Sequence, residues 1–153
     1  SHIAKRDGTY ERDALTYPYL ASHGYAGVRV DIRGSGESAG LLFDQYAKQE
    51  QVDGVELIAW LAAQRWCNGC VGIMGISWGA FNGLQIAACR PPALKAIVTI
   101  CSTDDRYADD AHYMGGTLLT TAGLEWAFFF FGLATTSSST SSIIERAALS
   151  PAR

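Results

Sequence analysis

The chain has 153 residues, enough for one domain with a sizeable core, and its 48% hydrophobic and 18% charged residues are typical of a folded globular protein. A formal net charge of -3 gives no electrostatic support for nucleic-acid binding. The polar start, residues 1–7, shows no secretory signal and favours a cytoplasmic protein. The longest apolar stretch, 126–134, is far shorter than the roughly 20 residues that span a bilayer, so we expect no membrane partner.

The first half of the chain alternates helical and strand patterns. Residues 14–20 are a short helix candidate, and residues 26–32 mix Val and Ile as a strand does. A loop rich in Gly and Ser follows at 33–38. Apolar residues then recur at helical spacing over 49–64, and Asn68-Gly69 predicts a turn.

The next elements continue the alternation. The apolar run 71–76 predicts a strand, residues 78–88 a helix that Pro91-Pro92 stops, and residues 94–101 another strand. The order strand, helix, strand, helix, strand predicts the α/β class, with a mostly parallel sheet and flanking helices.

Beyond this region the character of the sequence changes. We therefore divide the chain into residues 1–119, which form the α/β unit, and residues 120–153, which form an atypical tail. Within the tail, 126–134 is expected to be a buried segment or a lid element. The Thr/Ser run 135–142 has no periodicity and is expected to be a linker or disordered.

The most informative motif is Gly75-Ile76-Ser77-Trp78-Gly79, which reads G-x-S-x-G between the predicted strand and the predicted helix. This is the context of a nucleophile elbow, a tight turn that presents the serine hydroxyl above the sheet. Side chains at the two glycines would collide with the neighbouring strand and helix. The backbone N–H groups that follow Ser77 lie at a helix N-terminus, where they can stabilise an oxyanion. The alternative is a chance occurrence in a glycine-rich chain.

A serine nucleophile of this kind needs an acid and a histidine later in the chain, in that order. His112 is the histidine that follows Ser77, and Asp104 or Asp105 comes directly after a predicted strand. The alternatives are a loop histidine satisfied by its neighbours, and carboxylates that cap a loop or form salt bridges.

Two weaker motifs bear on cofactor and metal binding. Gly34, Gly36 and Gly40 follow a predicted strand but are spaced one residue off the dinucleotide-binding pattern, so they are expected to shape a turn. Cys67 and Cys70 form a single C-x-x-C pair with no second pair, which favours ordinary turn cysteines over a zinc site. We expect no cofactor and no metal.

Several separated segments resemble the X-Pro dipeptidyl-peptidase and cocaine esterase family of hydrolases. The resemblance covers about residues 5–119, and the segments that carry it are 31–38, 60–69, 72–79, 92–97, 102–107 and 112–116. It implies an α/β-hydrolase fold and acyl transfer through a serine ester without a metal. It also implies that Ser77 is the nucleophile and that the Trp78 backbone N–H is one oxyanion donor.

The resemblance leaves part of that machinery outside the matched segments. The family's second oxyanion donor is a Tyr hydroxyl, and Ile3 and Ala4 stand at that place here. The family's triad Asp and His lie on later strands, and nothing after Leu119 resembles that region.

The sequence therefore predicts the nucleophile-bearing part of a serine hydrolase, with a small ester or a short peptide as substrate. The alternative is a catalytically inactive α/β fragment that at most binds or associates. In an incomplete sheet an open edge favours self-association.

Overall fold

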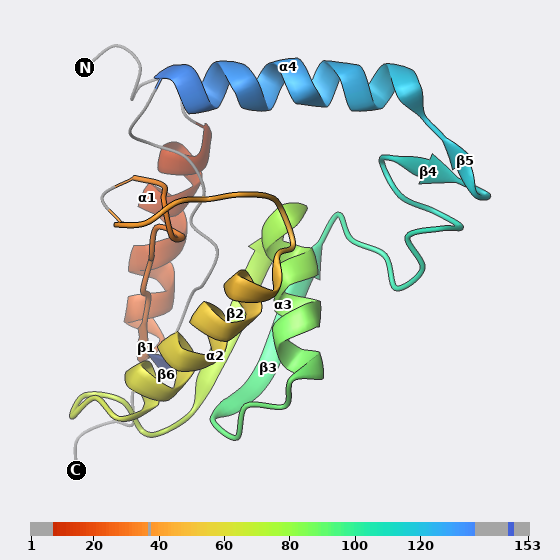
Figure 1. Ribbon diagram of the computed structural model, residues 1–153. Coiled ribbons are helices and arrows are strands. Elements are labelled where there is room, and N and C mark those ends of the chain that lie inside the picture. The colour runs from red at the N-terminus through yellow and green to blue at the C-terminus, as the bar shows by residue number, and fades with distance from the viewer. Residues whose placement is uncertain (1–7, 37, 137–146, 149–153) are drawn as a thin grey trace.

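A computed structural model shows helices arranged around a small sheet, and it describes residues 8–36, 38–136 and 147–148 (Figure 1). The elements in chain order are α1 (Gly8–Ser22), β1 (Tyr25–Ala26), α2 (Lys48–Ala62), β2 (Val71–Ile76), α3 (Trp78–Ala88), β3 (Leu94–Ile100), β4 (Tyr113–Met114), β5 (Thr117–Leu118), α4 (Thr120–Thr136) and β6 (Ala147–Ala148). The α/β class is thus confirmed within the described residues.

The main sheet has the strand order β1-β6-β2-β3, and β4 and β5 form a separate hairpin. Strands β2 and β3 are parallel, with Ile73 opposite Ile97, as the alternation of elements predicts. Strand β6, in contrast, runs antiparallel to both β1 and β2. The expected mostly parallel sheet is therefore correct for β2 and β3, the pair at one edge, whereas the sheet as a whole is mixed.

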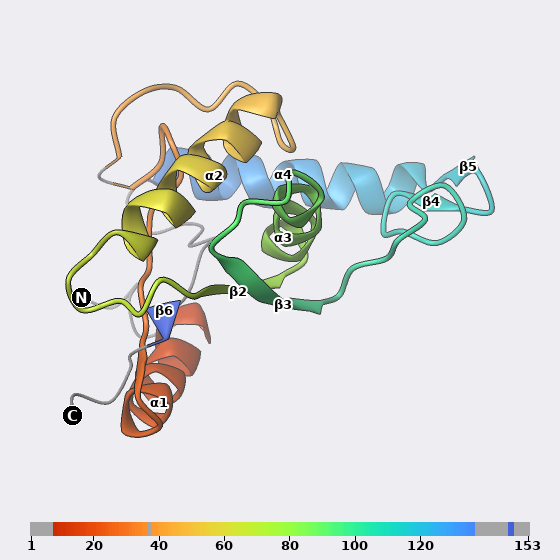
Figure 2. The ribbon, with the colours of Figure 1, turned by 90° about the horizontal axis from the view of Figure 1, so that it is seen from below.

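Helices α2 and α3 lie on one side of the sheet, and α1 lies on the other side, beside β1 (Figure 2). The fully buried core joins α2, β2 and α3 through Ile58, Leu61, Val71, Ile73 and Ile86. Burying each such side chain stabilises the fold by about 1.5–3 kcal/mol. This core fixes the junction between β2 and α3, where the G-x-S-x-G motif lies.

The predicted strand over 26–32 is largely wrong. Only Tyr25–Ala26 forms a strand, and it pairs with just two residues of β6. A strand needs a neighbour that satisfies its backbone groups, and hydrophobic patterning alone does not supply one. Helix α1 packs against the segment that follows β1. The ring of Tyr17 on α1 occupies the place where a side chain at Gly27 would lie.

The predicted elements around the motif agree closely with the structure. Helix α2 ends two residues before the predicted end, β2 and α3 have the predicted bounds, and β3 ends one residue early. Helix α1 extends beyond the predicted 14–20 at both ends and contains Pro18.

The start of the expected tail is the helix α4, which lies across the end of the molecule toward which β2 and β3 run (Figure 1). Phe128 is 70% exposed, so the buried-segment alternative for 126–134 is wrong at this residue, whereas the lid alternative stays a prediction. No helix among the described residues is both long and apolar enough to cross a membrane. Of the Thr/Ser run, residues 137–142 lie outside the described residues.

Candidate active site

Ser77 lies in a sharp turn between β2 and α3. Its backbone has φ 53° and ψ -114°, and non-glycine residues seldom adopt positive φ because Cβ then crowds the backbone. The turn is held on both sides, since the Ser77 N–H donates to the Ile100 carbonyl at 2.8 Å and the Ser77 carbonyl accepts from the Phe81 N–H at 3.0 Å. This is the strand–turn–helix geometry that a nucleophile elbow requires.

The glycine two residues before Ser77 has a steric cause. A Cβ on Gly75 would lie 2.7 Å from the Ala80 nitrogen and closer still to the carbonyl group of Gly79. The first turn of α3 therefore packs directly on the backbone of β2. Only glycine fits at residue 75, as the motif predicts.

The Ser77 hydroxyl is available for chemistry. Ser77 occupies the N-cap position of α3, yet its side chain makes no cap hydrogen bond. A serine at this position commonly caps its helix with the hydroxyl. Here the half-buried side chain borders a cavity instead.

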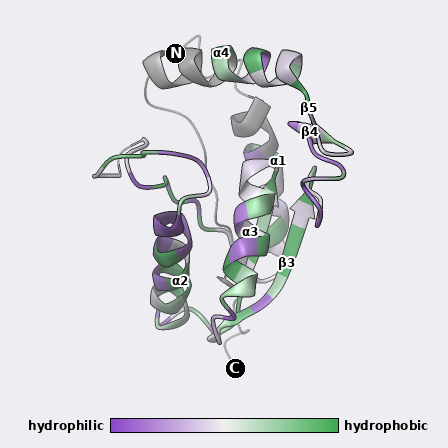
Figure 3. Cartoon of the chain, turned by 45° about the vertical axis from the view of Figure 1, so that its right-hand side comes forward, coloured by the Kyte–Doolittle hydropathy of each residue, from purple (hydrophilic) through white to green (hydrophobic). Residues whose placement is uncertain are grey.

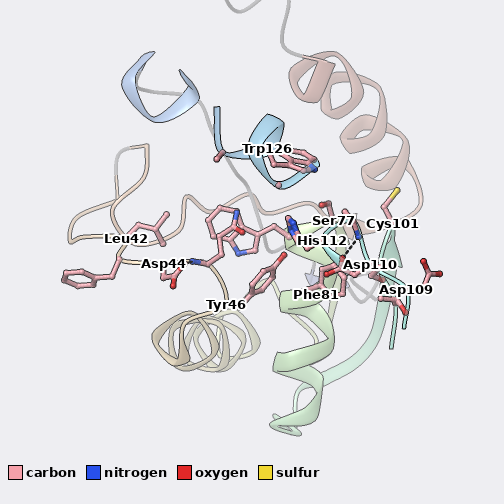
Figure 4. Close-up of a pocket in the computed structure, with 18 residues that line it drawn as sticks. Leu42, Asp44, Tyr46, Ser77, Phe81, Cys101, Asp109, Asp110, His112 and Trp126 are labelled. Carbon is pink, nitrogen blue, oxygen red and sulfur yellow. Dashed lines mark hydrogen bonds between the residues drawn. The ribbon is translucent and has the colours of Figure 1, made fainter. Parts of the chain in front are cut away.

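The cavity beside Ser77 has a volume of about 720 Å³, a size that suits a small organic ligand. Figure 4 shows its side chains, with Trp126 above Ser77 and His112 in that view. The lining comes from the start of α3, from the loops on either side of it and from α4: Leu42, Phe43, Asp44, Gln45, Tyr46, Ser77, Trp78, Phe81, Cys101, Ser102, Thr103, Asp109, Asp110, Ala111, His112, Gly123, Trp126 and Ala127.

The structure brings His112 to this cavity together with Ser77 and Trp78. Within the described residues, no hydrogen bond joins the His112 ring to Ser77 or to a carboxylate. His23 lies at the end of α1, where its ring bonds the Tyr19 carbonyl. Of these two histidines, His112 is the one positioned near the serine.

Asp104 and Asp105 are exposed and do not line the cavity. The Asp105 carboxylate accepts the N–H groups of Tyr107 and Ala108 at 3.0 and 3.1 Å. Asp105 therefore caps a local turn, which is the alternative to a role as the catalytic acid. The carboxylates that do line the cavity are those of Asp109 and Asp110, a few residues later in the chain.

Two aromatic residues that line the cavity, Tyr46 and Phe81, hold the Arg106 cation between their rings, which the sequence did not predict. The Arg106 guanidinium lies 4.4 Å from the Tyr46 ring centre and 4.3 Å from that of Phe81, and it pairs with Asp110 at 3.0 Å. Burial raises the pKa of the Tyr46 hydroxyl above its ordinary value, although the charge of Arg106 acts in the opposite direction. No pattern in the sequence links Tyr46 to Arg106, because the contact depends on loop geometry.

The glycines after residue 32 shape a turn, as the sequence predicts. Gly34, Gly36 and Gly40 all have positive φ, and a side chain at any of them would collide with residues within about eight positions along the chain. Arg33 anchors this loop to α2, because its guanidinium donates to both carboxylate oxygens of Asp53 at 2.7 and 2.6 Å. The pairing lowers the pKa of Asp53.

Cys67 and Cys70 also lie in a turn, where the Cys67 sulfur approaches the Cys70 carbonyl oxygen at 3.9 Å. In the part of the chain that the structure describes, no group of three or more His, Cys, Asp or Glu side chains is arranged to hold a metal ion.

Comparisons with known proteins place these features in a family. Residues 2–148 match the family described as X-Pro dipeptidyl-peptidase (S15 family). The chain is 38% identical over 98 residues to a candidate serine esterase of Mycobacterium bovis, covering 64% of this chain and 15% of that protein. It is 33% identical over 104 residues to a cocaine esterase of Rhodococcus, covering 68% and 18%, and 29% identical over 136 residues to a candidate Xaa-Pro dipeptidyl-peptidase of Streptomyces avermitilis, covering 78% and 20%. The chain therefore spans about a fifth or less of the length of these relatives.

Proposed function

The chain belongs to the X-Pro dipeptidyl-peptidase (S15) family, and from this premise we propose that Ser77 is the nucleophile of a hydrolase that cleaves a small ester or a short peptide. One observation carries the proposal: Ser77 has a strained backbone between β2 and α3, and its hydroxyl is not used to cap the helix. The turn conformation costs stability, and a serine that served only as a cap would not need it.

In the proposed reaction His112 takes the proton of the Ser77 hydroxyl as the serine oxygen attacks the carbonyl carbon. The negative charge that develops on the carbonyl oxygen is stabilised by the Trp78 backbone N–H at the start of α3. The bond to the leaving group then breaks, and His112 returns its proton to that group. Water repeats the sequence on the serine ester and releases the acid.

Although the family's own triad His lies on a later strand, we assign the base in this chain to His112 because it borders the same cavity as Ser77. Asp104 and Asp105 have no role in this mechanism, since their side chains lie outside the cavity. The aromatic and aliphatic lining, with Trp126 and Leu42, suits an apolar acyl or aryl group.

A second candidate is a non-catalytic α/β chain that binds ligands in this cavity without converting them. It is favoured by the absence, within the described residues, of a hydrogen bond between His112 and a carboxylate. Such a bond orients and supports the base in serine hydrolases.

Hydrolysis of p-nitrophenyl acetate separates the two candidates. The proposal expects turnover that falls to the uncatalysed rate in Ser77→Ala and persists in Ser22→Ala, because Ser22 is an exposed serine on α1. His112→Gln should lower the rate by a large factor, since general-base catalysis contributes about 10²–10⁴-fold. Equal rates in the wild type and Ser77→Ala would instead leave the binding candidate. A p-nitroanilide with proline at the second position then tests peptidase activity.

A further inference from the structure

We propose that Glu50 is a positioning residue that fixes the oxyanion-binding turn, by joining the first turn of α2 to the first turn of α3. The inference rests on the proposed function of Ser77 and Trp78. Glu50 borders a different cavity from Ser77, so its effect would pass through the residues to which it is bonded.

Three donors converge on the Glu50 carboxylate. One oxygen accepts the Ala47 backbone N–H at 3.1 Å, which is the glutamate half of a capping box at the start of α2. The other oxygen accepts the Trp78 indole N–H at 2.9 Å and the Asn82 side-chain amide at 2.6 Å. Trp78 and Asn82 are one turn apart on α3, so a single carboxylate secures the face of that helix next to the serine.

The bond to Trp78 reaches the residue that follows the nucleophile. The backbone N–H of Trp78 is the proposed oxyanion donor, and its indole is fixed from one side by Glu50 and from another by the edge of the Tyr46 ring, with ring centres 6.3 Å apart. Holding the side chain restricts the rotation of the first turn of α3. An oxyanion donor displaced by a fraction of an ångström loses much of its effect.

The buried side chain of Asn82 raises the loss of stability expected when the Glu50 carboxylate is removed. Its side chain is only 2% exposed, and its carbonyl oxygen has no hydrogen-bond partner within the described residues. The bond to Glu50 therefore serves only the NH₂ group of this amide, and removal of the carboxylate would leave that buried group unpaired as well.

A carboxylate is required at residue 50 because all three partners are donors. Glutamine has nearly the same shape but offers one acceptor oxygen and one NH₂ group. In Glu50→Gln the oxygen can serve Trp78 and Asn82 only if the NH₂ group meets the Ala47 N–H, donor against donor. The variant should therefore fold while its elbow is held less firmly.

The test compares Glu50→Gln with Glu56→Gln, an exposed glutamate on the same helix. The first readout is the indole N–H resonance of Trp78 in a ¹H–¹⁵N spectrum, assigned by its loss in Trp78→Phe. The second is the rate at which a fluorophosphonate modifies Ser77. We expect Glu50→Gln to shift the indole resonance and to slow the modification about tenfold, less than the roughly 10²–10³-fold cost of removing an oxyanion donor. Glu56→Gln should change neither.

Trp78→Phe adds a test by coupling. If Glu50 acts through the indole, Glu50→Gln in the Trp78→Phe background should slow the modification much less than in the wild type. Equal slowing in both backgrounds would overturn the proposed route through Trp78.

Other outcomes also decide the matter. An indole resonance that shifts while the modification rate stays at the wild-type value would overturn the positioning role and leave a structural contact only. An unchanged resonance in Glu50→Gln would show that the indole does not depend on a carboxylate at residue 50, and it would overturn the proposal. An unreactive wild-type protein would overturn the proposed function and the positioning role with it, whereas the indole shift would still report the contact.

Discussion

Gly75→Ala is the substitution that tests the elbow most severely. Its methyl group would lie 2.7 Å from the Ala80 nitrogen, whereas ordinary contacts of a Cβ begin at about 3.4 Å. The first turn of α3 must therefore move away from β2 by roughly 0.7 Å or more, since the opposing atoms are backbone and have no rotamer to change. That movement would displace both Ser77 and the Trp78 N–H.

The expected loss of stability follows from this overpacking. Inserting a methyl group into a close-packed site costs about 1–3 kcal/mol, equivalent to a melting temperature lower by about 2–12 °C for a chain of this size. The rate of Ser77 modification by a fluorophosphonate should also fall at temperatures where the variant is still folded.

Gly72→Ala is the matched control on the same strand. A Cβ at Gly72 would lie 3.6 Å from the Ala96 carbonyl oxygen, which is an ordinary contact. This variant should be as stable as the wild type or more stable by about 0.5–1 kcal/mol, because alanine loses less backbone freedom than glycine. Urea unfolding measures both variants. The reasoning fails if Gly75→Ala is as stable as Gly72→Ala and reacts at the wild-type rate.

Two further predictions concern the cavity and the sheet edge. Because burial raises the pKa of Tyr46, the folded state favours the protonated phenol, and stability should be lost as pH rises beyond about 10. Urea unfolding across this range should show a shallower loss in Tyr46→Phe, and equal losses would refute the idea. Strand β3 is mostly hydrophobic (Figure 3) and ends the strand order, with Val98 51% exposed. Val98→Lys should reduce concentration-dependent association in sedimentation velocity, whereas Val52→Lys on α2, also an exposed valine, should not.

The part of the fold that could be predicted from the sequence is the part whose signals are local. The β2–α3–β3 unit has a short apolar run, a helical stretch stopped by two prolines and a second apolar run, and each signal is complete within a few residues. The G-x-S-x-G turn belongs to the same class, since the space available at Gly75 is set by residues four and five positions away.

The features that could not be predicted depend on distant partners. The run at 26–32 has a strand's composition, but among the described residues only Tyr25–Ala26 forms a strand, and Asp31 forms a single bridge. Helix α4 has a continuous apolar run without helical periodicity, so the sequence did not distinguish a buried segment from a lid.

The candidate site divides in the same way. Ser77, Trp78 and His112 were predicted and share one cavity, whereas Asp104 and Asp105 lie outside it. The position of a carboxylate after a strand is set by the turn that follows, and Asp105 is used to close that turn. The contact of Glu50 with Trp78 was not predicted, because the two residues lie on different helices 28 positions apart in the chain.

The most direct test of the central claim is the intact mass of the chain after incubation with a fluorophosphonate, beside Ser77→Ala. The account predicts one adduct on the wild-type chain, located by peptide mapping at Ser77, and none on the variant. A folded wild-type chain that gains no adduct, or an adduct that persists in Ser77→Ala, would contradict it.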